Sequence, residues 1–531
     1  MTDLADEMMD LLLDDEPLSA TLLGLPGRDH LLRDFSGDAE LRARAEDVLR
    51  RAVGDDVTTA VVANEARSLI EKLDAGLVDL TFADAWNSAA SGLLTILPLV
   101  RPGDDAGRRD HLARLAAVPD FLARLEHRQR AAVTAGRVPL ERLARKGIAF
   151  LDRYLADPDG DPLLGPDPDP EREQLLVEEV RPAFSAYRDF LVAEVLPRGR
   201  SDDRPGLCHL PGGEAAYTAL LRRFTTTAAT PAELHRTGVE LMDRLEEEYR
   251  DLGFRVFGLD SAAATRDRVR ADPAFRWRDA DEVVAAAKAT LDRAWLVAPE
   301  WFGTLPRGEC AVERVPEAEQ HHGPLAYYVD PALDGSRPGT YYVNTRTPHE
   351  QDRTIGESLA FHESVPGHHL QISLAQERGD LPLLRRTALI DVYIEGWGLY
   401  AERLADEMGL YTDDVARLGM VSQDLVRAAR LVVDTGMHAF GWSRAKAVDY
   451  LRTRTAMPAD DVESQVDRFV ETPGQALAYM VGRLEIQRLR DEAAARMGDR
   501  FDLRAFHDLV LGGGPLPMAV LAGVVERWSA G

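Results

Sequence analysis

Cysteine is nearly absent from this sequence, which has only Cys208 and Cys310 among its 531 residues. Two cysteines exclude a disulfide framework and an all-thiolate zinc site by count alone. We expect both to be free thiols in a reducing compartment. The N-terminal segment lacks the basic start of a secretion signal, and acidic residues interrupt its short apolar run. The sequence therefore predicts a cytoplasmic protein.

Long apolar runs and a surplus of positive charge are also missing. No uncharged apolar segment approaches the roughly 18 residues of a membrane span, so neither a transmembrane helix nor a membrane partner is expected. Lys and Arg number 63 against 90 Asp and Glu, which gives a net charge of -27. Such a surface repels phosphate backbones, so no nucleic acid is expected as a partner.

Helical periodicity dominates what is present. Apolar residues recur at three- and four-residue spacing in the segments 40–75, 106–134, 138–155, 172–195, 279–297, 351–379, 384–408, 413–436 and 473–497. A capping box at Thr230-Pro231-Ala232-Glu233 predicts a further long helix that ends near Gly253. Three short segments rich in Val and Tyr predict strands at 310–315, 325–329 and 340–344. We expect a mainly α fold with a small β-sheet.

The length is too great for one simple core on ordinary domain sizes. A stretch rich in Pro, Asp and Gly at 157–170 and a second break at 197–211 interrupt the helical pattern. The expected organisation is an N-terminal helical lobe over 1–200 and a catalytic half over 201–531.

Three of the 13 histidines fall within eight residues, in His362-Glu363-Ser364-Val365-Pro366-Gly367-His368-His369. The His-Glu start is similar to the H-E-x-x-H zinc helix, in which two histidines one turn apart bind zinc and the glutamate takes a proton from water. The standard second histidine would fall at position 366, which is Pro. The simple motif is therefore absent.

The pair His368 and His369 can reach the same ion as His362 only if the helix breaks. In an unbroken helix His369 lies on the face of His362 but about 10 Å further along the axis, and His368 points about 120° away. Both nitrogens must instead lie about 2 Å from one zinc ion. Pro366 removes a backbone donor and Gly367 adopts unusual dihedral angles, so this dipeptide suits a break. One histidine of the pair would then return to the metal.

A catalytic zinc site requires a third protein ligand and one open position for water. The following helical segment, 392–402, supplies Glu395 in an apolar and aromatic context, where an unpaired carboxylate is costly. Pairing with Arg385 or Arg386 is the structural alternative. Glu402 lies seven residues later on the same face, as an alternate ligand or as an acceptor for a histidine N–H.

Several segments resemble a bacterial family known as domain of unknown function 885. They are EPLSATLLGL, DGSRPGTYYVN, FHESVPGHHLQ, IEGWGLYAERL, VVDTGMHAFGWS and ETPGQALAYMVG. The resemblance covers nearly the whole chain. That family is grouped with the zincin (gluzincin-like) metallopeptidases and is similar to the angiotensin-converting-enzyme and oligopeptidase type. It implies a two-lobed helical body with a deep central groove and the small sheet beside the active-site helix.

The resemblance implies roles for the histidine pair and for two later residues. Alignment on His-x-Gln favours His369 as the second metal ligand, whereas alignment on Gly-His favours His368. We expect His369 to bind the metal, with His368 behind it or on the substrate. His438 and Tyr479 would stabilise the oxyanion that forms on the attacked carbonyl. For each of these two, a buried, hydrogen-bonded core position is the structural alternative.

Substrate contacts are expected from the strand tyrosines and from one arginine. Tyr327, Tyr328 and Tyr342 lie in the predicted strands, where an edge strand can hold an extended substrate, and packing is the alternative. Met480 stands where the family often has Lys, and Arg483 is expected to replace part of that cation.

Together these residues predict a zinc-dependent hydrolase that cleaves an amide bond in a short peptide or peptide-like substrate. Zn²⁺, held by His362, His369 (or His368) and Glu395, would activate a water whose proton Glu363 accepts as general base. A dedicated hydrolase for one small-molecule amide or ester in a biosynthetic pathway would keep the same site. A non-catalytic metal-binding protein is the alternative from another class. No Gly-x-Ser-x-Gly element is present, so serine hydrolase chemistry is not expected.

Overall fold

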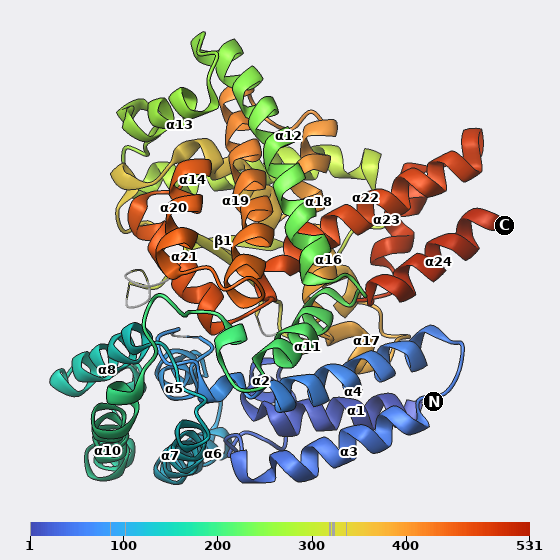
Figure 1. Ribbon diagram of the computed structural model, residues 1–531. Coiled ribbons are helices and arrows are strands. Elements are labelled where there is room, and N and C mark those ends of the chain that lie inside the picture. Colours follow the sequence, from blue (N-terminus) through green and yellow to red (C-terminus); the bar gives the residue numbers. More distant parts are fainter. Residues whose placement is uncertain (1, 85, 101, 318–319, 321–323, 336) are drawn as a thin grey trace.

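The computed structural model describes residues 2–531 apart from 85, 101, 318–319, 321–323 and 336 (Figure 1). The first helices are α1 (Thr2–Asp15), α2 (Pro17–Leu22), α3 (Asp38–Arg51), α4 (Val57–Ala75), α5 (Ala89–Ile96), α6 (Asp105–Ala116), α7 (Val118–Thr134), α8 (Glu141–Ala156), α9 (Pro170–Leu175) and α10 (Arg181–Phe190). The later helices are α11 (Gly213–Thr225), α12 (Pro231–Phe257), α13 (Ala262–Ala271), α14 (Ala280–Trp301), α15 (Gly356–Glu363), α16 (His368–Gln376), α17 (Leu383–Thr387), α18 (Asp391–Glu407), α19 (Asp414–His438), α20 (Arg444–Arg454), α21 (Ala459–Glu471), α22 (Ala478–Met497), α23 (Leu503–Leu511) and α24 (Met518–Ala530).

Two long helices, α12 and α19, lie side by side through the centre of the later part of the chain (Figure 1). α12 begins at the predicted capping box. Its Glu233 N–H donates to Thr230 Oγ1 at 3.3 Å, and the Thr230 N–H donates to the Glu233 carboxylate at 2.8 Å. The reciprocal pair satisfies two backbone donors that the first turn leaves without helical partners. Next to α12 and α19, α18 packs against α22.

Several of the predicted helical segments are divided into two α-helices, among them 40–75, 106–134, 351–379 and 384–408. Segment 40–75 forms α3 and α4, because Asp56 begins α4 as an N-cap whose carboxylate accepts from the Thr59 N–H at 3.0 Å. Segment 106–134 forms α6 and α7, and a proline occupies the first turn of α7. Both interruptions are local, and the apolar faces continue across them.

The three predicted strands are confirmed as one sheet, β1 (Cys310–Arg314), β2 (Ala326–Val329) and β3 (Gly339–Val343). The order is β1-β3-β2, with β3 parallel to β1 and antiparallel to β2. Tyr341 and Val343 of β3 pack with Val283 and Ala287 of α14 and with Ala360 of α15. The sheet therefore lies directly against the helix that carries His362. The predicted fold class, mainly α with a small sheet, is confirmed.

Two large apolar cores organise the described residues. The larger core joins Met8 of α1 and Leu69 of α4 to Leu220 of α11 and Trp397 of α18. The smaller core gathers side chains mainly from α5, α7, α8 and α10, together with Phe35 and Phe82. The first helices thus pack with the later half of the chain, and the predicted lobe boundary near residue 200 stays a prediction.

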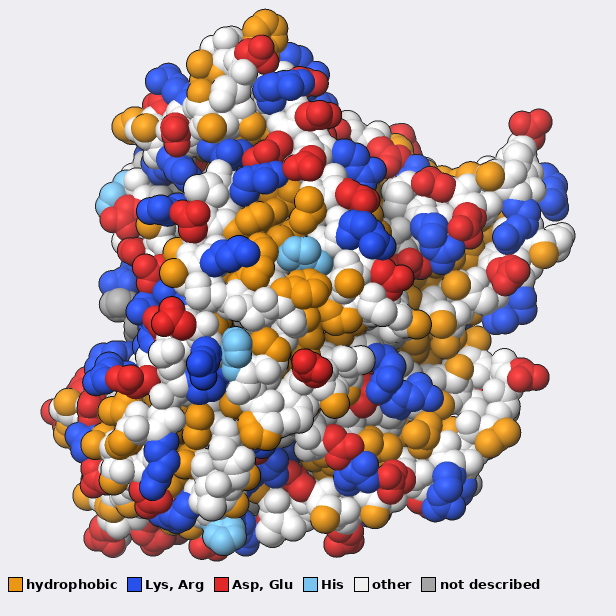
Figure 2. Space-filling view, viewed as in Figure 1, with side chains coloured by type: hydrophobic (Ala, Val, Ile, Leu, Met, Phe, Trp, Pro, Cys, Tyr) orange, Lys and Arg blue, Asp and Glu red, His pale blue; other side chains and the backbone are white. Residues whose placement is uncertain are grey.

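The exterior carries acidic and basic side chains intermixed on the face seen in Figure 2. On this face the acidic surplus is dispersed among arginines and lysines instead of forming one patch. Within the described residues, each helix is either too short or too polar to span a bilayer.

A buried carboxylate helps to connect the smaller core to the later half of the chain. Glu471, the last residue of α21, accepts hydrogen bonds from the backbone N–H groups of Phe82, Ala83 and Asp84 at 2.7, 2.8 and 2.7 Å. Its own carbonyl accepts from the Thr81 hydroxyl at 3.1 Å. Only 2% of Glu471 is exposed, so water has little access to its carboxylate.

We predict that Glu471→Gln destabilises the protein by about 2–4 kcal/mol, because the new amide N–H₂ opposes at least one buried donor that the carboxylate satisfied. Thermal unfolding followed by circular dichroism measures the change. Ser464→Ala, at an exposed position of the same helix, is the matched control. A Glu471→Gln variant that melts with the control would show that the carboxylate contributes little to stability.

Candidate metal centre

The histidine-rich segment breaks where the Pro-Gly dipeptide predicts. α15 ends at Glu363 and α16 begins at His368. Gly367 lies so close to the preceding turn that a Cβ there would be 1.9 Å from the carbonyl oxygen of His362. The indole N–H of Trp397 donates to the carbonyl of the proline before that glycine at 2.9 Å. Only glycine fits the break, and α18 holds it in place.

The break brings two imidazoles to one carboxylate. Nε2 of His362 lies 3.4 Å from Oε2 of Glu395, and Nε2 of His368 lies 3.5 Å from the same oxygen. One donor atom from each of the three residues lies within 4.8 Å of the others. Gly398, one turn after Glu395 on α18, makes room for this arrangement, because a Cβ there would be 2.6 Å from the His362 ring.

A second carboxylate on α18 orients the first histidine. Oε1 of Glu402 lies 2.9 Å from Nδ1 of His362, and the Ser358 hydroxyl donates to Oε2 of Glu402. Burial opposes a charge on His362, but Glu395 and Glu402 together raise its pKa to about 10. Glu402 bonds to Nδ1, whereas Nε2 of His362 faces Glu395, so Glu402 lies in the position of a support behind the imidazole.

The donor set fits a divalent cation. Two imidazoles and a carboxylate, with a carboxylate behind one imidazole, are the ligands and support typical of catalytic zinc. Although burial disfavours its charge, the two histidines hold the pKa of Glu395 well below its usual value. Glu363, Glu395 and Glu402 lie around His362 and His368, and Arg427 of α19, 3.7 Å from Glu402, offsets part of their negative charge.

Glu363 lies beside this centre with a free carboxylate. It makes no hydrogen bond to any described residue, although it interacts electrostatically with His362, His368 and Glu395. Burial raises its pKa, and the two histidines oppose that rise. A partly buried carboxylate with an elevated pKa is suited to accept and return a proton.

The structure does not bring His369 to the cluster, contrary to the expectation from the His-x-Gln alignment. Its Nδ1 lies 3.0 Å from the Tyr328 hydroxyl, and its Nε2 lies 3.1 Å from the carbonyl oxygen of Gly308. Burial lowers the pKa of His369 to about 4, so the ring is neutral. A neutral imidazole with both nitrogens bonded has no lone pair left for a metal, and His368 takes the position.

His438 is also turned away from the cluster, which corrects the expected oxyanion role. Its Nδ1 accepts from the Leu207 N–H at 3.1 Å, and its Nε2 donates to the Phe469 carbonyl at 2.9 Å. The ring stacks on Tyr217 and is 0% exposed. Burial lowers the pKa of His438 to about 3. His438 is therefore a buried, hydrogen-bonded core residue, which was the alternative to the oxyanion role.

Tyr479 lies at the cluster, as expected. Its ring stacks on that of His362, with the centroids 6.3 Å apart. Burial and the neighbouring Glu395 carboxylate raise the pKa of its hydroxyl, which therefore remains a hydrogen-bond donor.

Some of the residues that are expected to contact the substrate already interact with other groups of the protein. Arg483 pairs with the buried carboxylate of Asp424 at 2.6 Å, so its guanidinium is not free to replace a lysine. Tyr328 bonds to His369, and Tyr327 stacks on Tyr342 at 5.1 Å. The substrate role of the tyrosines stays a prediction.

A sequence family described as "Bacterial protein of unknown function (DUF885)" matches residues 17–525. The chain belongs to this family. A "putative lipoprotein" from Colwellia psychrerythraea is 25% identical, with a TM-score of 0.92 over 99% of both chains. A second protein of that description, of unknown function, from Shewanella oneidensis is 17% identical, with a TM-score of 0.73 over 98% of both chains. No curated protein shows a match.

Several residues at the centre of this DUF885 protein escaped sequence reasoning. Ser358 supports Glu402 one turn before His362. Arg427 of α19 lies 3.7 Å from Glu402, and Arg430 lies over the Tyr479 ring. The sequence contains a sign of this, because Arg427 and Arg430 interrupt the apolar stretch of α19 from Leu425 to Val433.

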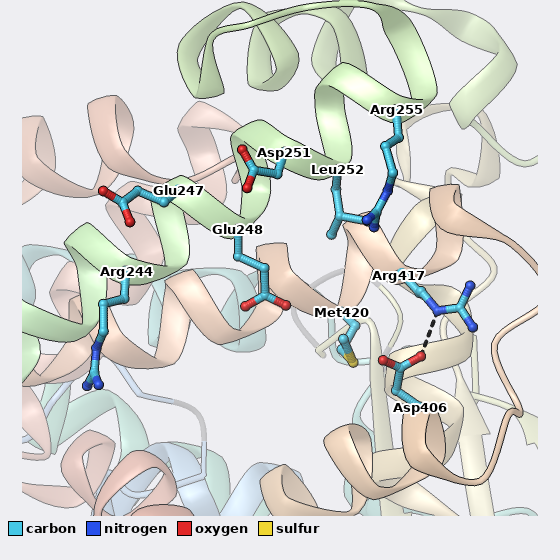
Figure 3. Close-up of a pocket in the computed structure, with 9 residues that line it drawn as sticks. All are labelled: Arg244, Glu247, Glu248, Asp251, Leu252, Arg255, Asp406, Arg417 and Met420. Carbon is cyan, nitrogen blue, oxygen red and sulfur yellow. Dashed lines mark hydrogen bonds and ion pairs between the residues drawn. The ribbon is translucent and has the colours of Figure 1, made fainter.

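A hollow of about 420 Å³ lies elsewhere, between α12 and the ends of α18 and α19 (Figure 3). It is lined by Arg244, Glu247, Glu248, Asp251, Leu252, Arg255, Asp406, Arg417 and Met420. Arg417 pairs with Asp406 across it at 2.7 Å. None of its lining residues belongs to the histidine cluster, so the deep groove expected for substrate stays a prediction.

We predict that His362→Ala, His368→Ala and Glu395→Ala each remove zinc from the purified protein, because each deletes one donor of a three-donor site. His369→Ala is the matched control and keeps zinc. Metal analysis by mass spectrometry measures the zinc content. Zinc lost from the His369 variant but kept by the His368 variant would reverse the assignment.

We also predict a pH effect on stability that does not involve the cluster. Burial raises the pKa of Asp434 from 3.8 to about 7, although it accepts from the Tyr217 hydroxyl at 2.6 Å. The folded protein therefore binds a proton that the unfolded chain releases, and this contribution to stability is lost as pH rises from about 4 to 7.

Asp434→Asn keeps an acceptor for the tyrosine and removes the titration, so its melting temperature should fall less than that of the parent over this pH range. Asp499→Asn, at an exposed position, should follow the parent. Identical pH profiles for the parent and Asp434→Asn would mean that this carboxyl is charged when folded.

Proposed function

We propose that this DUF885 protein is a zinc-dependent hydrolase of the zincin type that cleaves an amide bond in a short peptide or peptide-like substrate. The convergence of His362, His368 and Glu395 beside the unpartnered carboxylate of Glu363 carries the proposal. When bound, zinc supplies Lewis acidity and lowers the pKa of the attacking water.

The residues around the centre divide the remaining work. Glu363 accepts the proton of the water and returns it to the leaving amine. Tyr479 donates its hydroxyl to the oxygen of the attacked carbonyl, a role that falls to it because both nitrogens of His438 are bonded to backbone groups. Glu402 keeps Nε2 of His362 directed at the centre.

For location we propose the cytoplasm, which agrees with the two free thiols of Cys208 and Cys310. A hydrolase for one small-molecule amide or ester would use the same residues, so the substrate panel has to separate it from a peptidase.

We predict that Glu363→Gln retains the zinc of the parent and lowers kcat by roughly 10²- to 10⁴-fold, because the amide cannot accept the proton. The substrates are N-acylated dipeptides and tripeptides, assayed beside acylated amines and esters. Glu313→Gln, an exposed glutamate on β1, is the matched control.

Full activity of the Glu363→Gln variant would remove the proposed mechanism. Zinc binding without hydrolysis of any substrate by the parent would favour the non-catalytic metal-binding alternative. Cleavage of acylated amines or esters alone would favour the small-molecule hydrolase.

A further inference from the structure

Three arginines surround Tyr479 next to the histidine cluster. Arg427 and Arg430 lie on one face of α19, and Arg468 lies on α21. The Arg430 Cζ lies 4.7 Å from the centroid of the Tyr479 ring, and the Arg427 Cζ lies 6.0 Å from it. The charge of Arg468 also acts on the Tyr479 hydroxyl. Because Tyr479 stacks on His362, the three guanidinium groups border the proposed reaction centre.

Arg427 and Arg430 are buried and Arg468 is partly buried, and the negative charge that acts on them comes mainly from Glu395 and Glu402 of the cluster. Arg427 is 6% exposed and Arg430 is 7% exposed, and the Nε of each has no hydrogen-bond partner among the described residues. The hydrogen bonds of Arg430 and Arg468 to side-chain carbonyls go to neutral glutamines, Gln465 at 3.1 Å and Gln475 at 3.0 Å. Neither arginine forms an ion pair with a carboxylate in the described part of the chain.

Two arginines on the adjacent helices α18 and α22 do form ion pairs with carboxylates. Arg403 pairs with Glu248 at 2.6 Å, and Arg483 pairs with Asp424 at 2.6 Å. The fold therefore supplies counterions where arginines serve structure. At Arg430 burial and the like charges of Arg427 and Arg468 lower the pKa to about 10. Gathering like charges with unbonded donors is unfavourable unless an anion completes the set.

We infer that the three arginines form a subsite for a carboxylate of the substrate, so that the amide bond cleaved is the one next to a free carboxylate. The substrate class is then short peptides with a free C-terminus and N-acyl amino acids. A planar carboxylate matches the fork of donors on a guanidinium group. The choice of the amide bond that is cleaved rests on the proposed function. The binding of a carboxylate by the three arginines does not.

The first test compares N-acyl dipeptides that carry a free carboxylate with the same peptides as C-terminal carboxamides. The zinc-loaded parent should show a kcat/KM roughly 10- to 100-fold higher for the carboxylates, the range expected of charge-assisted hydrogen bonds. Arg430→Gln and Arg468→Gln should raise KM more for the carboxylates than for the carboxamides, so that the preference between the two substrates is lost. Arg430→Lys should retain part of the preference.

Arg488→Gln, on the exposed face of α22, is the control for loss of an arginine. Arg427 is left unchanged because it also approaches Glu402. Zinc content and melting temperature of each variant show whether it is folded. Equal rates for carboxylates and carboxamides in the parent would overturn the subsite while leaving the hydrolase proposal intact.

The second test needs no turnover. Calorimetric titration of the zinc-loaded parent compares glutarate with its diamide, glutaramide, which has no carboxylate. Tighter binding of glutarate, roughly 10-fold or more, that is lost in Arg430→Gln supports the subsite even if no peptide is cleaved. Equal affinities for the two probes in the parent would overturn it.

Discussion

The hydrogen bond between Nδ1 of His362 and the buried carboxylate of Glu402 is the contact on which the centre depends. It directs Nε2 of His362 toward Glu395, and Glu395 and Glu402 lie two turns apart on the same face of α18. Gly398, between them, leaves the space that the imidazole fills. α18 therefore supplies Glu395 as one donor, the space at Gly398 that the His362 ring fills, and Glu402, which orients that ring. The break before α16 adds His368 as the third donor.

The break could be predicted because its causes are local. A Pro-Gly dipeptide and the dimensions of a helix are enough to show that the segment from His362 to His369 does not continue as one helix. The choice between His368 and His369 is not local. It depends on how the chain leaves Gly367 and on Tyr328 and Gly308, which lie 41 and 61 residues away from His369 and bond to both of its nitrogens.

The helices themselves were visible in the sequence because apolar spacing and caps act within a few turns. The larger core was not, since it joins α1 and α4 to helices more than a hundred residues later. His438 is a second case in which residues far away in the sequence decide the role of a side chain. A motif marks the residue, but its partners Leu207 and Phe469 decide that it is a core histidine, and they lie 231 and 31 residues away.

The clamp at Glu471 recognises its partner loop through main-chain N–H groups alone at residues 82–84. Any non-proline residue offers the same donor, so these three bonds constrain the path of the loop and not its side chains, of which Phe82 is fixed separately by its place in the smaller core. At the end of α21 the side chain itself has to be a carboxylate. In the loop these bonds require only that the backbone keeps its path. The two parts of the chain can thus diverge in sequence at different rates and still remain in register.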